Sequence, residues 1–151
     1  MKITIAAIGA LKEYRKRISR YGELELLEFP DEKTPAKESE TEEEKIRNKE
    51  GKALLKLLND RDAYVIALVI KGERMDSLTF SRKIASLFSE GINRIIFLIG
   101  GSLGLSEEVI SRSDLRLSFS DFTFPHQMMR VILAEQLYRA MRIMHHEPYH
   151  K

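Results

Sequence analysis

The sequence predicts an α/β fold in which helices flank a mostly parallel sheet. Residues 63–70 form a continuous apolar run rich in β-branched side chains, which is typical of a strand covered on both faces. Residues 94–99 form a second buried strand, and a helical pattern separates the two. Because strands alternate with helices, the strands are expected to run parallel. No repeat or linker divides residues 1–151, so we expect a single domain.

Two strands and a basic helix are predicted before residue 30. Apolar residues alternate over residues 3–7, which predicts a strand. A secretion signal is disfavoured because the stretch is short and a lysine follows it closely. Residues 11–20 predict a short basic helix, and a second strand is indicated by Leu24, Leu26 and Phe29.

A charged segment comes next and leads into a longer helix. Residues 31–50 are rich in acids and bases, a pattern typical of a solvated face. Thr41 and Glu44 match a capping box, which predicts that a helix begins there and runs to about Leu58.

The second half of the chain is expected to add three helices and a last strand. Asp76 or Ser77 can cap a helix that runs to Phe88 and stops at Gly91. The remaining predicted elements are a short helix at 107–111, a strand at 115–119 and a long helix at 125–145.

Composition excludes several classes of function. The chain has 25 Lys and Arg against 23 Asp and Glu, a net charge of +2, which excludes a strongly basic nucleic-acid arm but not a local basic face. Cysteine is absent, which excludes disulfides, thiolate catalysis and cysteine-bound zinc, and suits a cytoplasmic protein. The longest apolar run is far shorter than the roughly 20 residues of a membrane span, so no membrane segment is expected. The histidines lack the spacing of a metal site, so no metal is expected.

Three glycines follow the strand at residues 94–99. Gly100, Gly101 and Gly104 stand where open α/β sheets bind ligands, and glycine allows a ligand to approach the backbone closely. Their spacing matches neither the dinucleotide-binding pattern nor the P-loop. The loop is therefore interpreted either as a tight turn or as a cofactor cradle.

Residues 117–127 combine aromatic rings, hydroxyls and an acid at the junction between a strand and a helix. Such a segment offers an apolar slot lined by backbone polar groups, which suits a flat purine ring. The alternative is a capped helix start, with Pro125 in the first turn and aromatic residues that belong to the core.

The last predicted helix is apolar on more than one side. Met129, Leu133, Leu137 and Met141 form a stripe at a spacing of four residues, and further apolar residues widen it. This pattern favours either a broad core helix or one that contacts both its own sheet and a second subunit.

The chain ends in a short polar tail after Pro148. Tails usually fray, which is one interpretation of this segment. The other is functional, because Tyr149, His150 and Lys151 bring a phenol, an imidazole and an ammonium that can bind a phosphate or move a proton near neutral pH.

Several motifs in combination resemble one family. They are the glycine loop, Leu-Ser-Phe-Ser at 117–120, Thr-Phe-Pro-His-Gln at 123–127, Met-Met-Arg at 128–130, Glu-Gln-x-Tyr-Arg at 135–139 and the final Tyr-His-Lys. The first residues and Phe-Pro-Asp-Glu-Lys at 29–33 extend the match over nearly the whole chain. In these motifs the sequence resembles the RlmH family of the SPOUT, or α/β-knot, superfamily, whose members methylate N3 of pseudouridine 1915 in helix 69 of 23S rRNA.

This resemblance implies a trefoil knot in the C-terminal half, a homodimer, and S-adenosylmethionine as the cofactor. The implied cofactor contacts are Leu68, Gly100, Gly101, Gly104, Leu117, Phe119, Ser120, Asp121, Phe122, Thr123 and Phe124. The residues implied on the RNA side are His126, Arg130, Arg139 and Lys151. Tyr149 and His150 are the implied catalytic residues, in a tail that would complete a site shared between subunits.

Two departures from the family pattern bear on the site. The first helix is shorter than the family's by roughly two turns, which would alter an outer surface of the dimer or an edge that contacts RNA. Asp121 and Phe122 stand where the family pattern has Lys and Met. The acid would help binding beside a cationic sulfonium and hinder it beside an RNA phosphate.

Methylation of N3 requires the loss of its proton, so a positioned base would accelerate the reaction. His150 is the first candidate for this base, with Tyr149 as its orienter or as an RNA contact. The low net charge favours a target folded within the ribosome over free RNA. The rival hypothesis is a non-catalytic, ribosome- or RNA-associated knot protein that binds only the cofactor.

Overall fold

The described residues form one parallel sheet of five strands. The computed structural model describes residues 2–7, 13–29, 39–59, 62–101 and 103–151. The strand order is β2-β1-β4-β3-β5, and each neighbouring pair is parallel. The strands are β1 (Lys2–Ala7), β2 (Glu23–Glu28), β3 (Tyr64–Arg74), β4 (Arg94–Ile99) and β5 (Leu115–Ser118). The predicted fold class is confirmed, and the trefoil knot stays a prediction.

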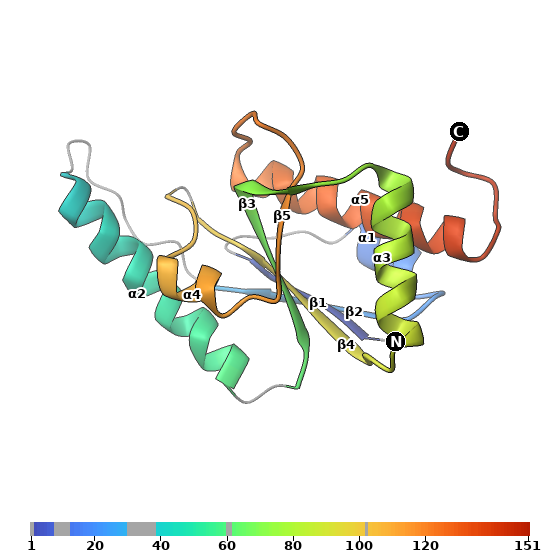
Figure 1. The fold of residues 1–151 in the computed structure, drawn as a ribbon, viewed down its shortest axis with the longest axis horizontal. Helices are drawn as coiled ribbons and strands as arrows, with labels where there is room; N and C mark the ends of the chain where they lie inside the picture. The colour runs from blue at the N-terminus through green and yellow to red at the C-terminus, as the bar shows by residue number, and fades with distance from the viewer. Residues whose placement is uncertain (1, 8–12, 30–38, 60–61, 102) are drawn as a thin grey trace.

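Helices cover both faces of this sheet, so the fold has three layers (Figure 1). The helices are α1 (Glu13–Ile18), α2 (Glu40–Asn59), α3 (Ser77–Ser89), α4 (Glu107–Ser111) and α5 (His126–Met144). Buried side chains of α1, α3 and α5 pack in one hydrophobic cluster, and those of α2 and α4 pack in a second on the opposite face. In the parts of the chain that are described, no helix is long and apolar enough to cross a membrane.

The central strand β4 shows why the buried strands have continuous apolar sequences. Ile95, Phe97 and Ile99 pack in the cluster under α3 and α5, whereas Ile96 and Leu98 pack in the cluster under α2. Since both faces are covered, alternation between apolar and polar residues is lost. Burial of each such side chain contributes roughly 1.5–3 kcal/mol to stability.

Helix caps match the sequence predictions with one correction. Asp76 caps α3 by accepting a hydrogen bond from the backbone N–H of Thr79 at 2.7 Å. The capping box of α2 was expected at Thr41 and Glu44, which is wrong. The observed box lies two residues earlier, since Ser39 and Glu42 exchange hydrogen bonds between side chain and backbone at 3.3 and 3.4 Å.

The pairing of β3 with β5 is irregular, and this irregularity shapes the site. Leu117 of β5 is paired with Leu68 and again with Glu73 of β3, so residues 69–72 leave the regular ladder. A Cβ atom on Gly72 would lie 2.8 Å from the backbone of β5, closer than real Cβ contacts come. The predicted strand at 63–70 therefore continues to Arg74, with a close crossing that needs glycine.

Helix α5 follows the predicted apolar stripe. Leu133, Leu137 and Met141 are fully buried against the sheet and α3, which confirms the core side of the helix. Outside the stripe, Met128 is 50% exposed and Val131 is 40% exposed. The surface of α5 near its first turn is therefore apolar and open within this chain.

Candidate active site

A large cavity lies at the carboxyl ends of β3, β4 and β5, beside the first turn of α5. Its volume is about 430 Å³. Ten of the eleven residues proposed as cofactor contacts line it, and they are Leu68, Gly100, Gly101, Gly104, Leu117, Phe119, Ser120, Phe122, Thr123 and Phe124. The carboxyl edge of a parallel sheet is where open α/β folds bind ligands.

The glycine loop is a tight turn as well as a wall of this cavity. The backbone N–H of Gly104 donates to the carbonyl of Gly101 at 3.0 Å, and Gly104 has a φ of +83°. A Cβ atom on Gly100 would lie 2.5 Å from the carbonyl carbon of Gly104. Glycine at position 100 is thus required by the close approach of the chain's own backbone rather than by that of a ligand.

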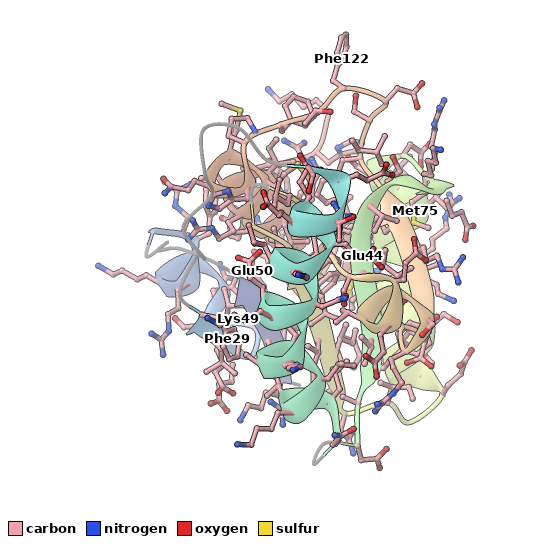
Figure 2. All side chains as sticks on the ribbon, turned by 90° about the vertical axis from the view of Figure 1, so that its left-hand side faces the viewer. Phe29, Glu44, Lys49, Glu50, Met75 and Phe122 are labelled. Atoms are coloured by element: carbon pink, nitrogen blue, oxygen red, sulfur yellow. The ribbon has the colours of Figure 1, made fainter. Side chains whose placement is uncertain are left out.

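The loop between β5 and α5 forms the opposite wall and is held by its own serines. The Ser118 hydroxyl donates to the carbonyl of Ser120 at 3.1 Å, and the Ser120 hydroxyl accepts from the N–H of Phe122 at 3.0 Å. Phe122 is 77% exposed and extends away from the body of the molecule (Figure 2). Pro125 is the N-cap residue of α5, and no side chain caps that helix.

Asp121 is the one proposed cofactor contact that does not line the cavity. Its carboxylate pairs with the guanidinium of Arg74 at the end of β3. Both side chains are about two-thirds exposed, at 68% and 66%. The structure therefore places this acid on the outer side of the loop.

Several lining residues were missed by the sequence analysis. They are Val69, Ile70, Lys71, Ile99, Leu103, Leu105, Ser118 and Met129. Residues 69–71 reach the cavity because they leave the ladder between β3 and β5. The signal in the sequence was Gly72, directly after an apolar run, since an isolated glycine in a strand often marks a bulge or a close backbone approach.

The C-terminal tail packs on α5 rather than fraying. His146 adopts a left-handed conformation with φ of +55°, and the N–H of Glu147 donates to the carbonyl of Arg142 at 2.8 Å. The Arg142 guanidinium then donates to the carbonyl of Pro148 at 2.9 Å. These contacts turn the chain back along the helix.

Glu135 and Arg139 of α5 hold the two proposed catalytic residues. Arg139 donates twice to one oxygen of Glu135, at 3.0 and 2.6 Å, and its guanidinium lies 4.8 Å from the ring centre of Tyr149. The Tyr149 hydroxyl donates to the same carboxylate oxygen at 3.1 Å. Burial of the ring, followed by this hydrogen bond, raises the pKa of Tyr149 above its ordinary value of 10.0.

Arg139 also fixes the tautomer of His150. Its Nη1 atom lies 3.1 Å from Nδ1 of His150. Because a guanidinium donates hydrogen bonds and cannot accept them, Nδ1 must be the acceptor. A neutral imidazole in this contact carries its hydrogen on Nε2, so His150 can donate from Nε2 but has no free lone pair with which to take a proton.

The residues expected on the RNA side lie in different environments. His126 lines the cavity at the first turn of α5, Arg139 is half-buried in the cluster with the tail, and Lys151 is exposed. Arg130 is only 1% exposed. Its guanidinium is therefore placed inside the protein, which does not support a direct contact with RNA.

The cavity lies at the first turn of α5, whereas the tail is held by Glu135 in the middle of this helix and by Arg139 one turn later. His126 lines the cavity, and Arg139 holds the tail thirteen residues later, which corresponds to about 20 Å along a helix axis. Among the described residues, no group of three or more His, Asp or Glu is arranged to hold a metal ion.

Comparisons with known proteins identify the family of the chain. Residues 1–150 match a family model described as "Predicted SPOUT methyltransferase". The chain belongs to the SPOUT methyltransferase family. It is therefore a methyltransferase and uses a methyl donor, which confirms the family, the fold class and the enzymatic activity expected from the sequence motifs.

Curated relatives match this family member along their whole length. Ribosomal RNA large subunit methyltransferase H of Clostridium perfringens strain 13 is 51% identical, and that of Alkaliphilus oremlandii is 49% identical. A protein of Methanococcus vannielii named putative ribosomal RNA large subunit methyltransferase H is 48% identical. Each alignment covers 100% of both chains over 160 positions, so these relatives carry residues that this shorter chain lacks.

Proposed function

We propose that this protein is a homodimer that transfers a methyl group from S-adenosylmethionine to N3 of pseudouridine 1915 in large-subunit rRNA, within the assembled ribosome in the cytoplasm. Membership of the SPOUT methyltransferase family supports the reaction class, and the names of the relatives support rRNA as the substrate. The observation that carries the proposal is the cavity, because segments that are far apart in the sequence and contain ten of the proposed cofactor contacts line it together.

The cavity fits the proposed cofactor in size and chemistry. Its volume of about 430 Å³ is within the roughly 300–1,000 Å³ of small-molecule sites. Apolar side chains, among them Leu68, Leu117 and Met129, offer a slot for adenine, while the glycine loop and residues 118–120 offer backbone polar groups. When bound, S-adenosylmethionine supplies an electrophilic methyl group on a sulfonium. The protein's contribution is to orient the acceptor base and exclude water.

In the proposed dimer, a second copy of the chain brings its tail to the cavity. The tail is held near Arg139, about 20 Å along α5 from the cavity that His126 lines in the same chain. Met128 and Val131 leave an apolar surface on α5 beside the cavity. Packing of two copies through this surface would bury these apolar side chains and allow each tail to reach the partner's cavity.

In such a site the tail would act through hydrogen bonds. His150 would present its Nε2–H, with Nδ1 held by Arg139, and Tyr149 would be fixed by Glu135. A base role for His150 would require that Arg139 release Nδ1. The contact between Arg139 and Nδ1 therefore favours His150 as a hydrogen-bond donor that positions a phosphate or a base carbonyl. Glu135 and Arg139 are positioning residues.

Methyl transfer to purified ribosomes tests the reaction and the rival hypothesis together. Ribosomes from cells that lack this protein are incubated with the protein and labelled S-adenosylmethionine, and the rRNA is digested for mass spectrometry. We expect one additional methyl group on one pseudouridine. Binding of S-adenosylmethionine in calorimetry without any methyl transfer would favour the non-catalytic protein, and transfer to a short deproteinised fragment would argue against a ribosomal target.

A further inference from the structure

Helix α1 presents a basic surface that the donor cavity does not use. We define the α1 surface as the side chains of Arg15, Lys16, Arg17 and Arg20, all of them exposed. Buried Ile18 anchors the helix in the core. The ring centres of Tyr14 and Tyr138 of α5 lie 6.4 Å apart. In the part of the chain that is described, no carboxylate pairs with Arg15 or Lys16.

The neighbouring end of α5 adds more positive charge. Seven cationic side chains are described in this region. They belong to α1 and residue 20, to the second half of α5 and to the tail, and they are Arg15, Lys16, Arg17, Arg20, Arg139, Arg142 and Lys151. The described carboxylates of these segments, Glu135 and Glu147, are already engaged by Arg139, Arg142 and Arg20. Because the whole chain carries only +2, positive charge is concentrated at this end of the molecule.

Four of these arginines stack on tyrosine rings. Their guanidinium carbons lie 5.3 Å from Tyr14, 5.2 Å from Tyr21, 5.9 Å from Tyr138 and 4.8 Å from Tyr149, measured to the ring centres. Stacking restricts a guanidinium and so lowers the entropy that its side chain loses when it binds a partner. Held arginines on a basic surface fit a polyanion with closely spaced phosphates, which is the chemistry of an RNA backbone.

The position of this surface decides which cavity it serves. The α1 surface lies at the tail end of α5, since Arg20 pairs with Glu147, four residues before Lys151. The cavity of the same chain lies at the other end of that helix. In the dimer proposed above, the tail reaches the partner's cavity, so the α1 surface lies beside that cavity too.

We infer that the α1 surface of one protomer binds the RNA phosphates that flank a base held at the cavity of its partner. This inference rests on the proposed function and extends it, because it assigns the RNA backbone to α1 and does so across the dimer. An anionic membrane or an acidic protein would be a different partner for the same charges, and the stacked arginines favour RNA.

Charge reversal tests the surface itself. Arg15→Glu with Lys16→Glu is compared with Lys52→Glu with Lys56→Glu, an equal change of charge on exposed positions of α2. We expect the first pair to raise KM for ribosomes about 10-fold and to lower the slope of log KM against log salt by about 1.5. Both pairs should leave kcat and the Kd for S-adenosylmethionine within about twofold. Equal effects of the two pairs would overturn the inference, since only net charge would then matter.

Mixed dimers with two different tags test whether the surface acts across the dimer. One protomer carries Gly100→Ala in its cavity, and the other carries the two α1 substitutions. If the α1 surface acts at the partner's cavity, the intact cavity faces an intact α1 surface. KM for ribosomes then stays as in the native dimer, and the activity is about half. With all three substitutions in one protomer, the remaining cavity faces a reversed surface, and KM rises about 10-fold. The opposite pattern would overturn the inference.

Two controls separate the alternatives. If Gly100→Ala fails to form dimers, Met129→Trp fills the cavity from α5 instead. Binding of the native protein to anionic vesicles that Arg15→Glu with Lys16→Glu abolishes, with KM for ribosomes unchanged, would assign the surface to a membrane and overturn the inference. Failure of the native protein to methylate ribosomes would instead overturn the proposed function.

Discussion

The two ends of α5 use different parts of the chain to build a site. At the cavity end the walls are backbone and apolar side chains, supplied by the ends of three strands and by glycines that allow close approach. At the tail end the surfaces are charged and aromatic side chains connected by hydrogen bonds and stacking. The cavity end suits the binding of one small ligand that matches its shape and has a flat apolar part. The tail end suits contact with a large anion. The difference suggests that donor binding and substrate handling can be altered separately.

Gly100→Ala should have the largest effect of these substitutions, a loss of affinity for S-adenosylmethionine at the cavity end. Its Cβ atom would lie 2.5 Å from the carbonyl carbon of Gly104, so the glycine loop must shift. We expect the affinity for S-adenosylmethionine to fall at least 100-fold in calorimetry, with the melting temperature lowered by a few degrees. Retained affinity would show that this loop does not hold the cofactor. Gly91→Ala, at a positive φ with open space around it, is the control for a destabilised backbone outside the cavity.

Substitution of His150 should affect turnover and leave the cavity end intact. His150→Ala is expected to lower kcat about 100-fold, comparable to the loss of one well-placed donor, with the Kd for S-adenosylmethionine within about twofold. His150→Gln keeps an N–H donor, so we expect it to recover at least tenfold over the alanine variant. Equal losses in kcat for both variants would instead assign His150 as the general base.

Gly51 and Ser106 test the support behind the glycine loop. A Cβ atom on Gly51 would lie 2.5 Å from the Ser106 hydroxyl, which itself caps α4. Gly51→Ala alone should lower the free energy of unfolding by about 1–3 kcal/mol, as overpacking does. In a Ser106→Ala background the same change should cost less, because the hydroxyl at 2.5 Å is gone while Val109 stays at 3.2 Å, and Ala is favoured over Gly in a helix by about 1 kcal/mol. Urea unfolding of the four proteins measures the coupling, and additive effects would contradict the predicted contact.

At the tail end, the Tyr149 contact should depend on pH. Its raised pKa means that the phenol is bound in its protonated form, so the stabilisation is fully present below pH 10.0 and is lost as pH rises through the higher folded value. Tyr149→Phe should cost about 1 kcal/mol at pH 8 and less at strongly alkaline pH. Urea unfolding of both proteins at each pH measures the difference. A cost that does not change with pH would contradict a hydrogen bond from the protonated phenol as the source of this stabilisation.

These two ends also differed in how far the sequence could predict them. The strands of the cavity end could be predicted because burial on both faces of β4 requires a continuous apolar run. The residues that line the cavity could be proposed from the family motifs. Residues 69–71 were missed because their departure from the ladder depends on pairing with Leu117, which is distant in sequence. The cap of α2 was placed wrongly because Ser39–Glu42 and Thr41–Glu44 have the same spacing, and only the backbone geometry selects one.

At the tail end, sequence predicted residue types but not contacts. The motif contained Arg139, Tyr149 and His150, yet nothing in it showed that one guanidinium would hold both tail side chains. Arg130 was placed on the RNA side because the family resemblance implied it, whereas the structure buries it in α5. Burial of a charged residue depends on partners from other elements, and a single sequence does not show them.

The smallest expected effect is that of substituting Asp121, which tests whether this carboxylate takes part in binding at the cavity. Its pair with Arg74 joins two side chains that are about two-thirds exposed, and such pairs contribute at most about 1 kcal/mol. Because the carboxylate lies outside the cavity, Asp121→Asn should change the Kd for S-adenosylmethionine less than twofold in calorimetry, and Arg74→Gln should behave alike. A tenfold loss for Asp121→Asn but not for Arg74→Gln would mean that the acid turns inward to face the sulfonium. The loop from β5 to α5 would then have to close over the bound cofactor, and the cavity would no longer be a preformed site.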